Sequence, residues 1–227
     1  MAENPGSTFQ GGDEAQSHTF SGILRAARRL FLTRGYEGTS VADIAKDVGI
    51  TPGAIYWHFK SKTEVLATVL EDGLAEFRKC ILGALTGSTP TVRLYQLVTT
   101  QVRSQLTDYY IQDVLSTNFV ISQLADQLPP SPRERIRGLL RAHLDLVEDI
   151  IRSGVEASEF RVDQIAVTAL AVINLADSAI TWFRSSGPLT ADEIAHIYGL
   201  LALRMVGSVR IDSVEAGAGS YRGEASR

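Results

Sequence analysis

The sequence predicts an all-α protein of nine helices, of which the first three are short and basic and the last six form a larger apolar bundle. Two observations predict it. Apolar residues recur at spacings of three and four along nearly all of the chain between residues 19 and 209, which is the period of an amphipathic helix. Hydroxyl and acidic residues three positions apart precede several of these segments, a pattern typical of helix N-termini. There is no strand-like alternation and no internal repeat.

The expected helices span about 19–34, 41–48, 52–58, 62–84, 90–106, 109–126, 132–153, 163–184 and 190–209. Four hydroxyl–acid pairs predict capping boxes, in which a side-chain oxygen accepts from an otherwise unpaired N–H: Ser40 with Asp43, Ser61 with Glu64, Ser131 with Glu134, and Thr190 with Glu193. Proline at a first helical position loses no hydrogen bond, and this predicts helix starts at Pro52 and Pro132. Four glycines mark expected helix ends: Gly35, Gly49, Gly154 and Gly187.

Composition and periodicity divide the chain into four parts. Residues 1–17 and 211–227 lack periodicity and are expected to be disordered tails, whereas 18–63 and 64–210 are expected to form two helical domains. Seven cations and three anions between His18 and Lys62 give that segment a charge of +4. The whole chain carries −4, so the remainder carries −8. This asymmetry favours a DNA-facing N-terminal module on an acidic body.

Cysteine and hydropathy patterns indicate a cytoplasmic protein without a membrane span. The single cysteine, Cys80, cannot form an internal disulfide, and we interpret it as a small core residue in a reducing compartment. Residues 1–17 contain no apolar stretch of the kind found in a secretory leader. The most apolar run, 165–183, contains Asn174 and Asp177, which a lipid-facing helix tolerates poorly.

Residues 41–60 predict a helix-turn-helix whose second helix is presented to the major groove of DNA. Gly49 occupies the turn, Thr51 caps the second helix and Pro52 begins it. Gly53 and Ala54 are small enough for the backbone to approach base edges closely. Hydrogen-bonding rings follow at Tyr56, Trp57 and His58, and phosphate-binding groups flank the motif at Thr39, Ser40, Thr51, Lys60 and Lys62.

These residues resemble the TetR family of one-component repressors. The resemblance is carried over about 50 residues by Phe31, Gly35, Tyr36, Thr39 and Ser40, followed by DIAKDVGITPGAIYWHFKSKTEVL from Asp43 to Leu66. It implies a homodimer that reads a palindromic operator with one recognition helix per subunit. It also implies phosphate contacts at Thr39, Ser40, Tyr56, His58 and Lys62, and base-edge contacts at Thr51, Pro52, Gly53 and Trp57.

Trp57, His58 and Lys60 also have interpretations that involve no DNA contact. Trp57 could anchor the core, His58 could be a satisfied structural histidine, and Lys60 could simply be solvated. Phe31, Tyr36, Ile44, Ile55 and Phe59 are expected in the core.

The rest of the chain shows no catalytic pattern. The four histidines (His18, His58, His143 and His196) lie far apart, and none is spaced with cysteine or carboxylate as in a metal site. No glycine-rich phosphate loop or nucleophile elbow is present. We therefore expect a regulator without enzymatic activity, cofactor or metal.

Polar residues on the apolar helix 163–184 admit two interpretations. Asn174, Asp177, Ser178 and Thr181 fall at i, i+3, i+4 and i+7, and such groups must be paired when buried. They could contact a ligand or form a seam across a dimer two-fold axis. The family pairs its last two helices between subunits, which favours the seam. The candidate pocket residues are Tyr109, Tyr110, Phe119, Gln123, His143, Asn174, Asp177 and Trp182, of which the aromatic residues and His143 also fit a plain core role.

The predicted function is transcriptional repression that a small lipophilic effector relieves by moving the helix at 62–84. The run Trp182–Thr190 resembles a loop of some actinobacterial family members that regulate lipid and acyl-CoA catabolism, so an acyl-CoA or related acid is the effector class it suggests. Two alternatives remain, a transcriptional activator and an architectural DNA-binding protein that needs no effector.

Overall fold

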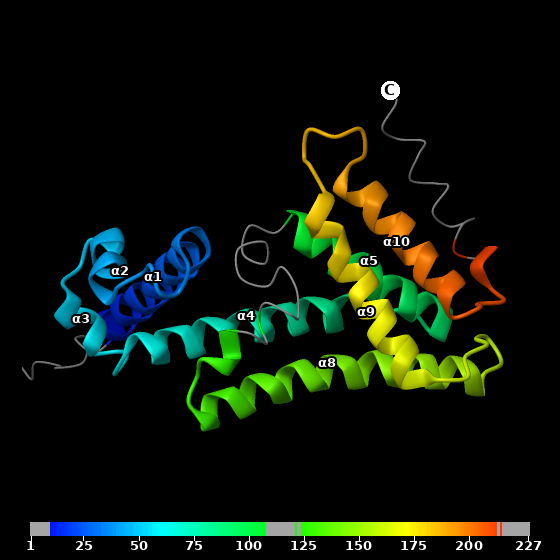
Figure 1. The fold of residues 1–227 in the computed structure, drawn as a ribbon, viewed down its shortest axis with the longest axis horizontal. Coiled ribbons are helices and arrows are strands. Elements are labelled where there is room, and N and C mark those ends of the chain that lie inside the picture. The colour runs from blue at the N-terminus through cyan, green and yellow to red at the C-terminus, as the bar shows by residue number, and fades with distance from the viewer. Residues whose placement is uncertain (1–9, 108–120, 122–123, 213, 215–227) are drawn as a thin grey trace, which may run out of the picture. The chain divides into compact units, whose positions relative to one another are not determined.

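The protein is helical throughout the part of the chain that the structure describes (Figure 1). This computed structural model describes residues 10–107, 121, 124–212 and 214, and the side chains from residue 18 onward within those ranges. The helices are α1 (Gln10–Arg34), α2 (Val41–Val48), α3 (Pro52–Tyr56), α4 (Lys62–Ala84), α5 (Pro90–Thr107), α8 (Pro130–Glu156), α9 (Ile165–Trp182) and α10 (Ala191–Met205). The chain divides into two compact units, Met1–Leu70 and Glu71–Arg227, and the division falls within α4 rather than at its start near residue 63.

The first unit is built by packing short helices across one another. α2 contacts both α1 and α3, and its apolar face is buried at Ile44 and Ala45. Ile55 supplies the buried side chain of α3, and Ile23 and Leu66 are buried on α1 and α4. The five residues of α3 are too few to form a stable helix alone, so this packing holds α3 in place.

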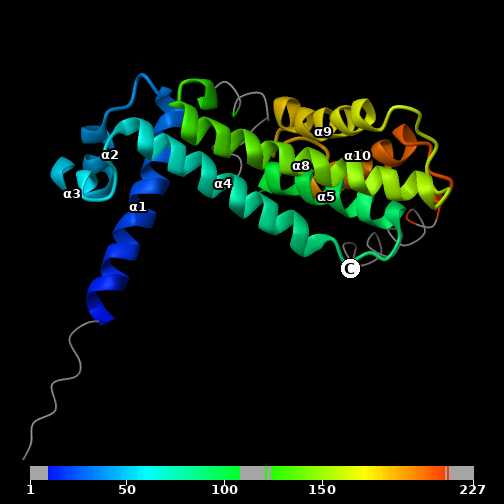
Figure 2. The same cartoon turned by 90° about the horizontal axis from the view of Figure 1, so that it is seen from below.

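The second unit is organised around α5, which contacts α8, α9 and α10 (Figure 2). Its buried residues include Leu94, Leu97, Val98 and Val102. Helix α10 approaches α5 closely at Gly199, because a Cβ there would lie 2.6 Å from the Tyr95 ring and 2.8 Å from Thr99. Among the helices that the structure describes, α9 is the one long and apolar enough to cross a membrane, but its Ala169, Val172, Ile173 and Ala176 form part of the buried core of this unit. One face of α9 therefore belongs to the core of the second unit.

A buried carboxylate caps the N-terminus of α5 from a distant part of the chain. Glu159, in the α8–α9 connection, accepts from the backbone N–H (3.0 Å) and hydroxyl (2.8 Å) of Thr91 and from Arg210 Nη1 (3.1 Å). Burial by itself raises the pKa of Glu159, but these hydrogen bonds outweigh it and lower the pKa. The contact therefore joins α5, the α8–α9 connection and the segment after α10.

Several predicted boundaries were wrong for identifiable reasons. Helix α1 begins at Gln10, within the expected tail, and α3 ends at Tyr56 rather than residue 58. Helix α8 begins at Pro130, so Ser131 is not its N-cap and instead accepts from Arg135 Nη1. The earlier Pro130 suits the first helical position as well as Pro132 does. The expected helix 109–126 lies largely outside the described residues.

Two expected helix ends and the C-terminal tail also need correction. Gly154 lies inside α8, where it makes room for the ring of Phe160, and Gly187 lies beyond the end of α9. Ile211 and Val214, placed in the expected tail, pack against the core of the second unit. Of the four expected capping boxes, those of Ser40 and Thr190 are formed in full, while Glu64 binds the backbone N–H of Lys60 instead of that of Ser61.

Replacing Gly154 with alanine tests this packing. A Cβ at this position would lie 2.0 Å from a Phe160 ring atom, so G154A should lower the free energy of unfolding by about 1–3 kcal/mol. Gly138 of the same helix has no neighbour within 4 Å of a Cβ, so G138A should raise stability by up to about 1 kcal/mol. Urea denaturation followed by circular dichroism measures both, and equal effects of the two substitutions would refute the assigned role of Gly154.

Candidate DNA-binding surface and effector cavity

The turn between α2 and α3 is fixed by local hydrogen bonds. Gly49 ends α2 with φ of 77°, and its backbone N–H donates to the carbonyls of Ala45 and Lys46. Two residues later Thr51 Oγ1 accepts from the backbone N–H of Ala54 (3.3 Å), with Pro52 at the first position of α3. The predicted helix-turn-helix is therefore present, with the expected caps at its turn.

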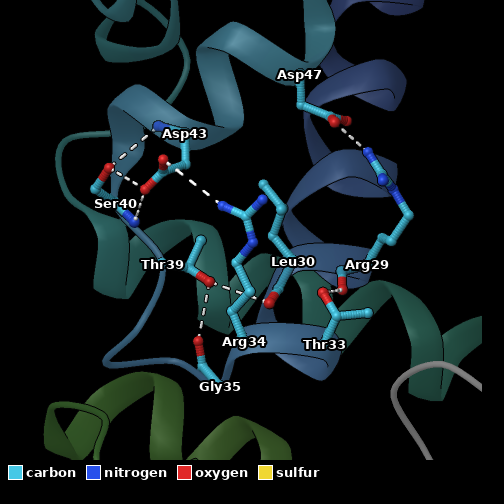
Figure 3. Close-up of polar contacts among 9 residues, drawn as sticks. All are labelled: Arg29, Leu30, Thr33, Arg34, Gly35, Thr39, Ser40, Asp43 and Asp47. Carbon is cyan, nitrogen blue, oxygen red and sulfur yellow. Dashed lines mark hydrogen bonds and ion pairs between the residues drawn. The ribbon is translucent and has the colours of Figure 1, made fainter.

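The N-terminus of α2 is held by Ser40 and Asp43 (Figure 3). Asp43 N donates to Ser40 Oγ (3.1 Å), and Ser40 N donates back to Asp43 Oδ2 (2.9 Å). The hydrogen bonds from the hydroxyl and backbone of Ser40 lower the pKa of Asp43 below its ordinary value. Arg34 lies 3.8 Å from the other carboxylate oxygen, and Arg29 pairs with Asp47 at the far end of α2. These contacts fix α2 on α1.

The exposed side of α3 is the surface that sequence analysis assigned to DNA. Thr51, Pro52 and Gly53 are exposed, and the Tyr56 residue is 56% exposed. Trp57, which ends α3, is 90% exposed. An indole left in water has no structural function, so the interpretation of Trp57 as a core anchor is wrong.

Three predicted contact residues also have internal partners. Thr39 is buried, and its hydroxyl donates to the carbonyls of Leu30 (3.1 Å) and Gly35 (2.9 Å), as Figure 3 shows. Lys62 Nζ donates to Tyr36 O (2.9 Å) and lies 4.1 Å from the Tyr36 ring centroid. The His58 ring packs edge-on against Phe20. The burial of Thr39 gives it a structural role in holding the loop before α2, and its side chain is not exposed to a phosphate.

A shallow hollow beside α3 brings several of the predicted residues together. It is lined by Glu37, Gly38, Thr39, Ser40, Val41, Ala42, Asp43, Pro52, Tyr56 and Lys62. Ser40, Tyr56 and Lys62 therefore share one surface although they lie on different helices. The predicted base-reading residues Thr51, Gly53 and Trp57 lie outside this hollow.

The second unit contains a cavity with an apolar wall and a polar end. Its lining comes from α4 (Leu74, Phe77, Arg78), α5 (Gln101, Gln105), Ile121, α8 (Leu139, Leu140, His143) and α9 (Asp177). The cavity itself has a volume of about 20 Å³, and the wider space between these residues, about 490 Å³ free of protein atoms, includes open solvent. Four of the polar residues form one chain, in which Gln101 and Gln105 donate to Asp177 and His143 contacts Gln101, while Arg78 donates to the carbonyl of Ala142.

The predicted pocket residues meet in this cavity only in part. His143 and Asp177 line it, but Asn174 and Trp182 are exposed elsewhere on α9. Tyr109, Tyr110, Phe119 and Gln123 lie outside the described residues. Sequence analysis missed Arg78, Gln101 and Gln105. A signal for the glutamines existed, because two amides at i and i+4 stand on the buried face of α5.

Comparison with known proteins identifies the family. A model of the bacterial regulatory proteins of the tetR family matches residues 23–69, and a model of the tetracyclin repressor-like C-terminal domain matches residues 87–206. The chain belongs to the TetR family. Its exposed α3 is therefore the second helix of a TetR helix-turn-helix, and its cavity lies in the TetR C-terminal domain.

TetR relatives cover most of the chain. The transcriptional repressor KstR2 of Mycobacterium tuberculosis is 26% identical over 80% of this chain and 89% of its own length. The structure of PfmR from Thermus thermophilus has a TM-score of 0.66 and 31% identity, over 80% of this chain and 97% of PfmR. AibR, solved with isovaleryl coenzyme A and operator DNA, shares the fold with a TM-score of 0.72 and 23% identity, over 81% of this chain and 97% of AibR.

Helices α9 and α10 of this TetR chain each leave an apolar row exposed. On α9 the row contains Val167 (65% exposed) and Leu170, together with the polar Asn174 and Thr181. On α10 the exposed row is Ile197, Leu201 and Met205. Asp177 lies instead at the edge of the buried face and reaches the cavity. The polar stripe of α9 is thus divided: Asp177 lines the cavity, Asn174 and Thr181 lie on the exposed row, and Ser178 donates to the carbonyl of Leu175.

The pH dependence of stability tests the environment of His143. Burial, and next the charge of Arg78, lower the pKa of His143 from 6.5 to about 4. Protonation therefore favours the unfolded chain, so this contribution to stability is complete above pH 6.5 and is lost as the pH falls towards 4. The loss should reach about 3 kcal/mol. Urea denaturation at several pH values measures it.

A histidine substitution isolates this effect from other titrating groups. H143Q should flatten the dependence of unfolding free energy on pH between 6.5 and 4, whereas H18Q, at an exposed histidine, should leave the slope as in wild type. If H143Q and wild type show the same slope, the burial of a neutral His143 is refuted.

Proposed function

We propose that this protein is a cytoplasmic transcriptional repressor that binds a palindromic operator as a homodimer and is released by a small lipophilic effector. The observation that carries the proposal is the exposed side of α3, where Thr51, Pro52, Gly53 and Trp57 stand in water on a helix fixed by caps and packing. Small residues there let the backbone approach base edges, and Trp57 and Thr51 offer hydrogen-bond donors. The relative KstR2 is named a transcriptional repressor, which supports repression over activation.

Phosphate contacts fall to residues around the recognition surface. Ser40 stands at the exposed N-terminus of α2, and Tyr56 and Lys62 line the same hollow. Lys62 can serve both DNA and the fold, since an ammonium has three donors and only one is held by Tyr36 O. His58 is half-buried against Phe20, and its remaining exposed part is proposed as a further phosphate contact.

The cavity supports a regulated protein over an architectural one. An architectural DNA-binding protein needs no ligand site, whereas this chain places buried polar groups beside an apolar wall in the TetR C-terminal domain. AibR, a protein of the same fold, was solved with isovaleryl coenzyme A, and another solved relative is described as the ketosteroid regulator KstR2. The coenzyme A ester solved with AibR and the name of KstR2 support a lipophilic effector, with acyl thioesters as the first class to test.

Release would act through α4. This one helix begins at Lys62, beside the recognition surface, and contributes Leu74, Phe77 and Arg78 to the cavity. A dimer reads two half-sites about 34–36 Å apart, so a shift of α4 would spoil the match to the operator. The effector must bind the shifted state more tightly than the operator-bound state, because equal affinity for both changes nothing.

The direct test is operator binding by the full-length protein. Fluorescence anisotropy with a palindrome-containing fragment from upstream of its own gene should show binding whose affinity falls steeply as salt rises, because phosphate contacts release counterions. Addition of the effector should release the fragment. Absence of binding at low salt to any such palindrome would refute the proposal.

Truncation of Trp57 tests the recognition surface. W57A should weaken operator binding tenfold or more, at about 1–3 kcal/mol for a lost specific contact, and leave unfolding free energy within about 0.5 kcal/mol, because the indole is 90% exposed. V209A, at a 54% exposed apolar residue of the other unit, is the control and should bind as wild type does. If W57A binds the operator as tightly as wild type does, Trp57 does not contact DNA.

A charge on the exposed row of α10 tests the dimer. L201E should convert a dimer into a monomer in analytical ultracentrifugation and weaken operator binding, because a carboxylate cannot be buried unpaired in an apolar interface. L82E places the same charge on an exposed leucine of α4 and should leave the dimer intact. If L201E remains dimeric, α10 does not form the interface.

A further inference from the structure

The polar end of the cavity is organised by one carboxylate. Gln101 Nε2 and Gln105 Nε2 both donate to Asp177 Oδ1, at 2.8 and 2.7 Å. All three residues are buried. A carboxylate oxygen only accepts, so both amides must present their NH₂ groups to Asp177. Their carbonyl oxygens consequently point away from it.

The two amide oxygens differ in their hydrogen-bond donors. Gln101 Oε1 lies 3.1 Å from His143 Nε2. Since Gln101 already uses its NH₂ group towards Asp177, the histidine must donate, and its Nε2 carries the proton. Gln105 Oε1, by contrast, is buried and has no hydrogen-bond partner in the part of the chain that the structure describes.

An acceptor buried without a donor weakens the fold, and native proteins retain few of them. Gln105 is only 3% exposed and lines the cavity, so its oxygen is not satisfied by bulk water. Rotating the amide would not help, because it would set two acceptors against each other at Asp177. The surrounding residues therefore leave Gln105 Oε1 as an unpaired acceptor on a residue that lines the cavity, where a molecule that enters could donate to it.

We infer that the effector of this protein is a largely apolar molecule that donates a hydrogen bond to Gln105 Oε1 from a hydroxyl or amide group. The inference deepens the proposed effector response and rests on it. Leu74, Phe77, Ile121, Leu139 and Leu140 provide the apolar wall for the rest of the molecule. A free carboxylic acid cannot make this contact, because its ionised group has no donor for Gln105 Oε1 and would be repelled by Asp177 there, even though Arg78 lines the same cavity. A thioester conjugate that carries amide N–H groups remains compatible.

Three probes of matched shape test the inference on the wild-type protein. 4-Hexylphenol has a donor, 4-hexylanisole has none, and 4-hexylbenzoic acid is an anion at neutral pH. Isothermal titration calorimetry should show the phenol binding about tenfold more tightly than the anisole, the ratio expected for one buried hydrogen bond, and more tightly than the benzoate. Equal or tighter binding of the anisole or the benzoate, or no binding of the phenol, overturns the inference.

A substitution at Gln105 locates the donor contact. Q105M keeps the length of the side chain and removes both amide groups, so it should bind the phenol and the anisole equally. Q96M is the matched control, because Gln96 also lies on α5 but bonds Gly87 and Thr86 instead of lining the cavity. It should keep the tenfold preference. A preference retained in Q105M overturns the inference, and the wild-type probe series decides it even where Q105M fails to fold.

Operator binding without any probe separates this inference from the proposed function. Wild type and Q105M should bind the operator alike, because Gln105 lies outside the DNA-binding unit. Failure of wild type to bind any operator would refute the proposed repressor, while the calorimetric comparison of phenol and anisole would still decide the donor contact.

Discussion

The recognition helix α3 is stable only because residues outside it hold it in place. Five residues form little more than one helical turn, and a helix of that length is unstable in water by itself. Burial of Ile55 against α2, the Thr51 cap and the left-handed turn at Gly49 supply what the helix lacks. Because the cap and the turn hold the N-terminal end of α3 and Ile55 supplies its buried side chain, Tyr56 and Trp57 are free to remain in water. The exposure of Trp57 is thus a consequence of how α3 is held.

The chain of four polar residues in the cavity, in contrast, is buried. Asp177 determines the orientation of two glutamines, and one of these determines the tautomer of His143. Each step is forced by the inventory of donors and acceptors rather than by shape. Burial and the charge of Arg78 lower the pKa of His143, whereas the hydrogen bonds to Asp177 leave Gln105 Oε1 without a donor. The neutral histidine and the unpaired acceptor therefore have different causes, although both line one cavity.

Local sequence signals predicted the first unit better than the second. The caps at Ser40 and Thr51 and the turn at Gly49 follow from interactions within a few residues, and all three were predicted and confirmed. The predictions that failed involve either a second residue that competes for the same role or a contact between residues far apart in the sequence. Pro130 displaced Pro132 as the start of α8, and Gly154 serves Phe160 instead of ending the helix. Glu159 caps α5 across 68 positions, which no local pattern could indicate.

The cavity residues that sequence analysis missed show the same limit in functional terms. Gln101 and Gln105 are ordinary helix residues by sequence, and their meaning comes from Asp177, which lies more than seventy positions away. Polar spacing on α9 did predict that buried groups there needed partners, but it could not separate Asp177 from Asn174, one turn earlier on the outer row. Periodicity gives the face of a helix only to within the width of one side chain. At the edge between a cavity and a surface, that width decides whether a residue lines the cavity, as Asp177 does, or stays exposed, as Asn174 does.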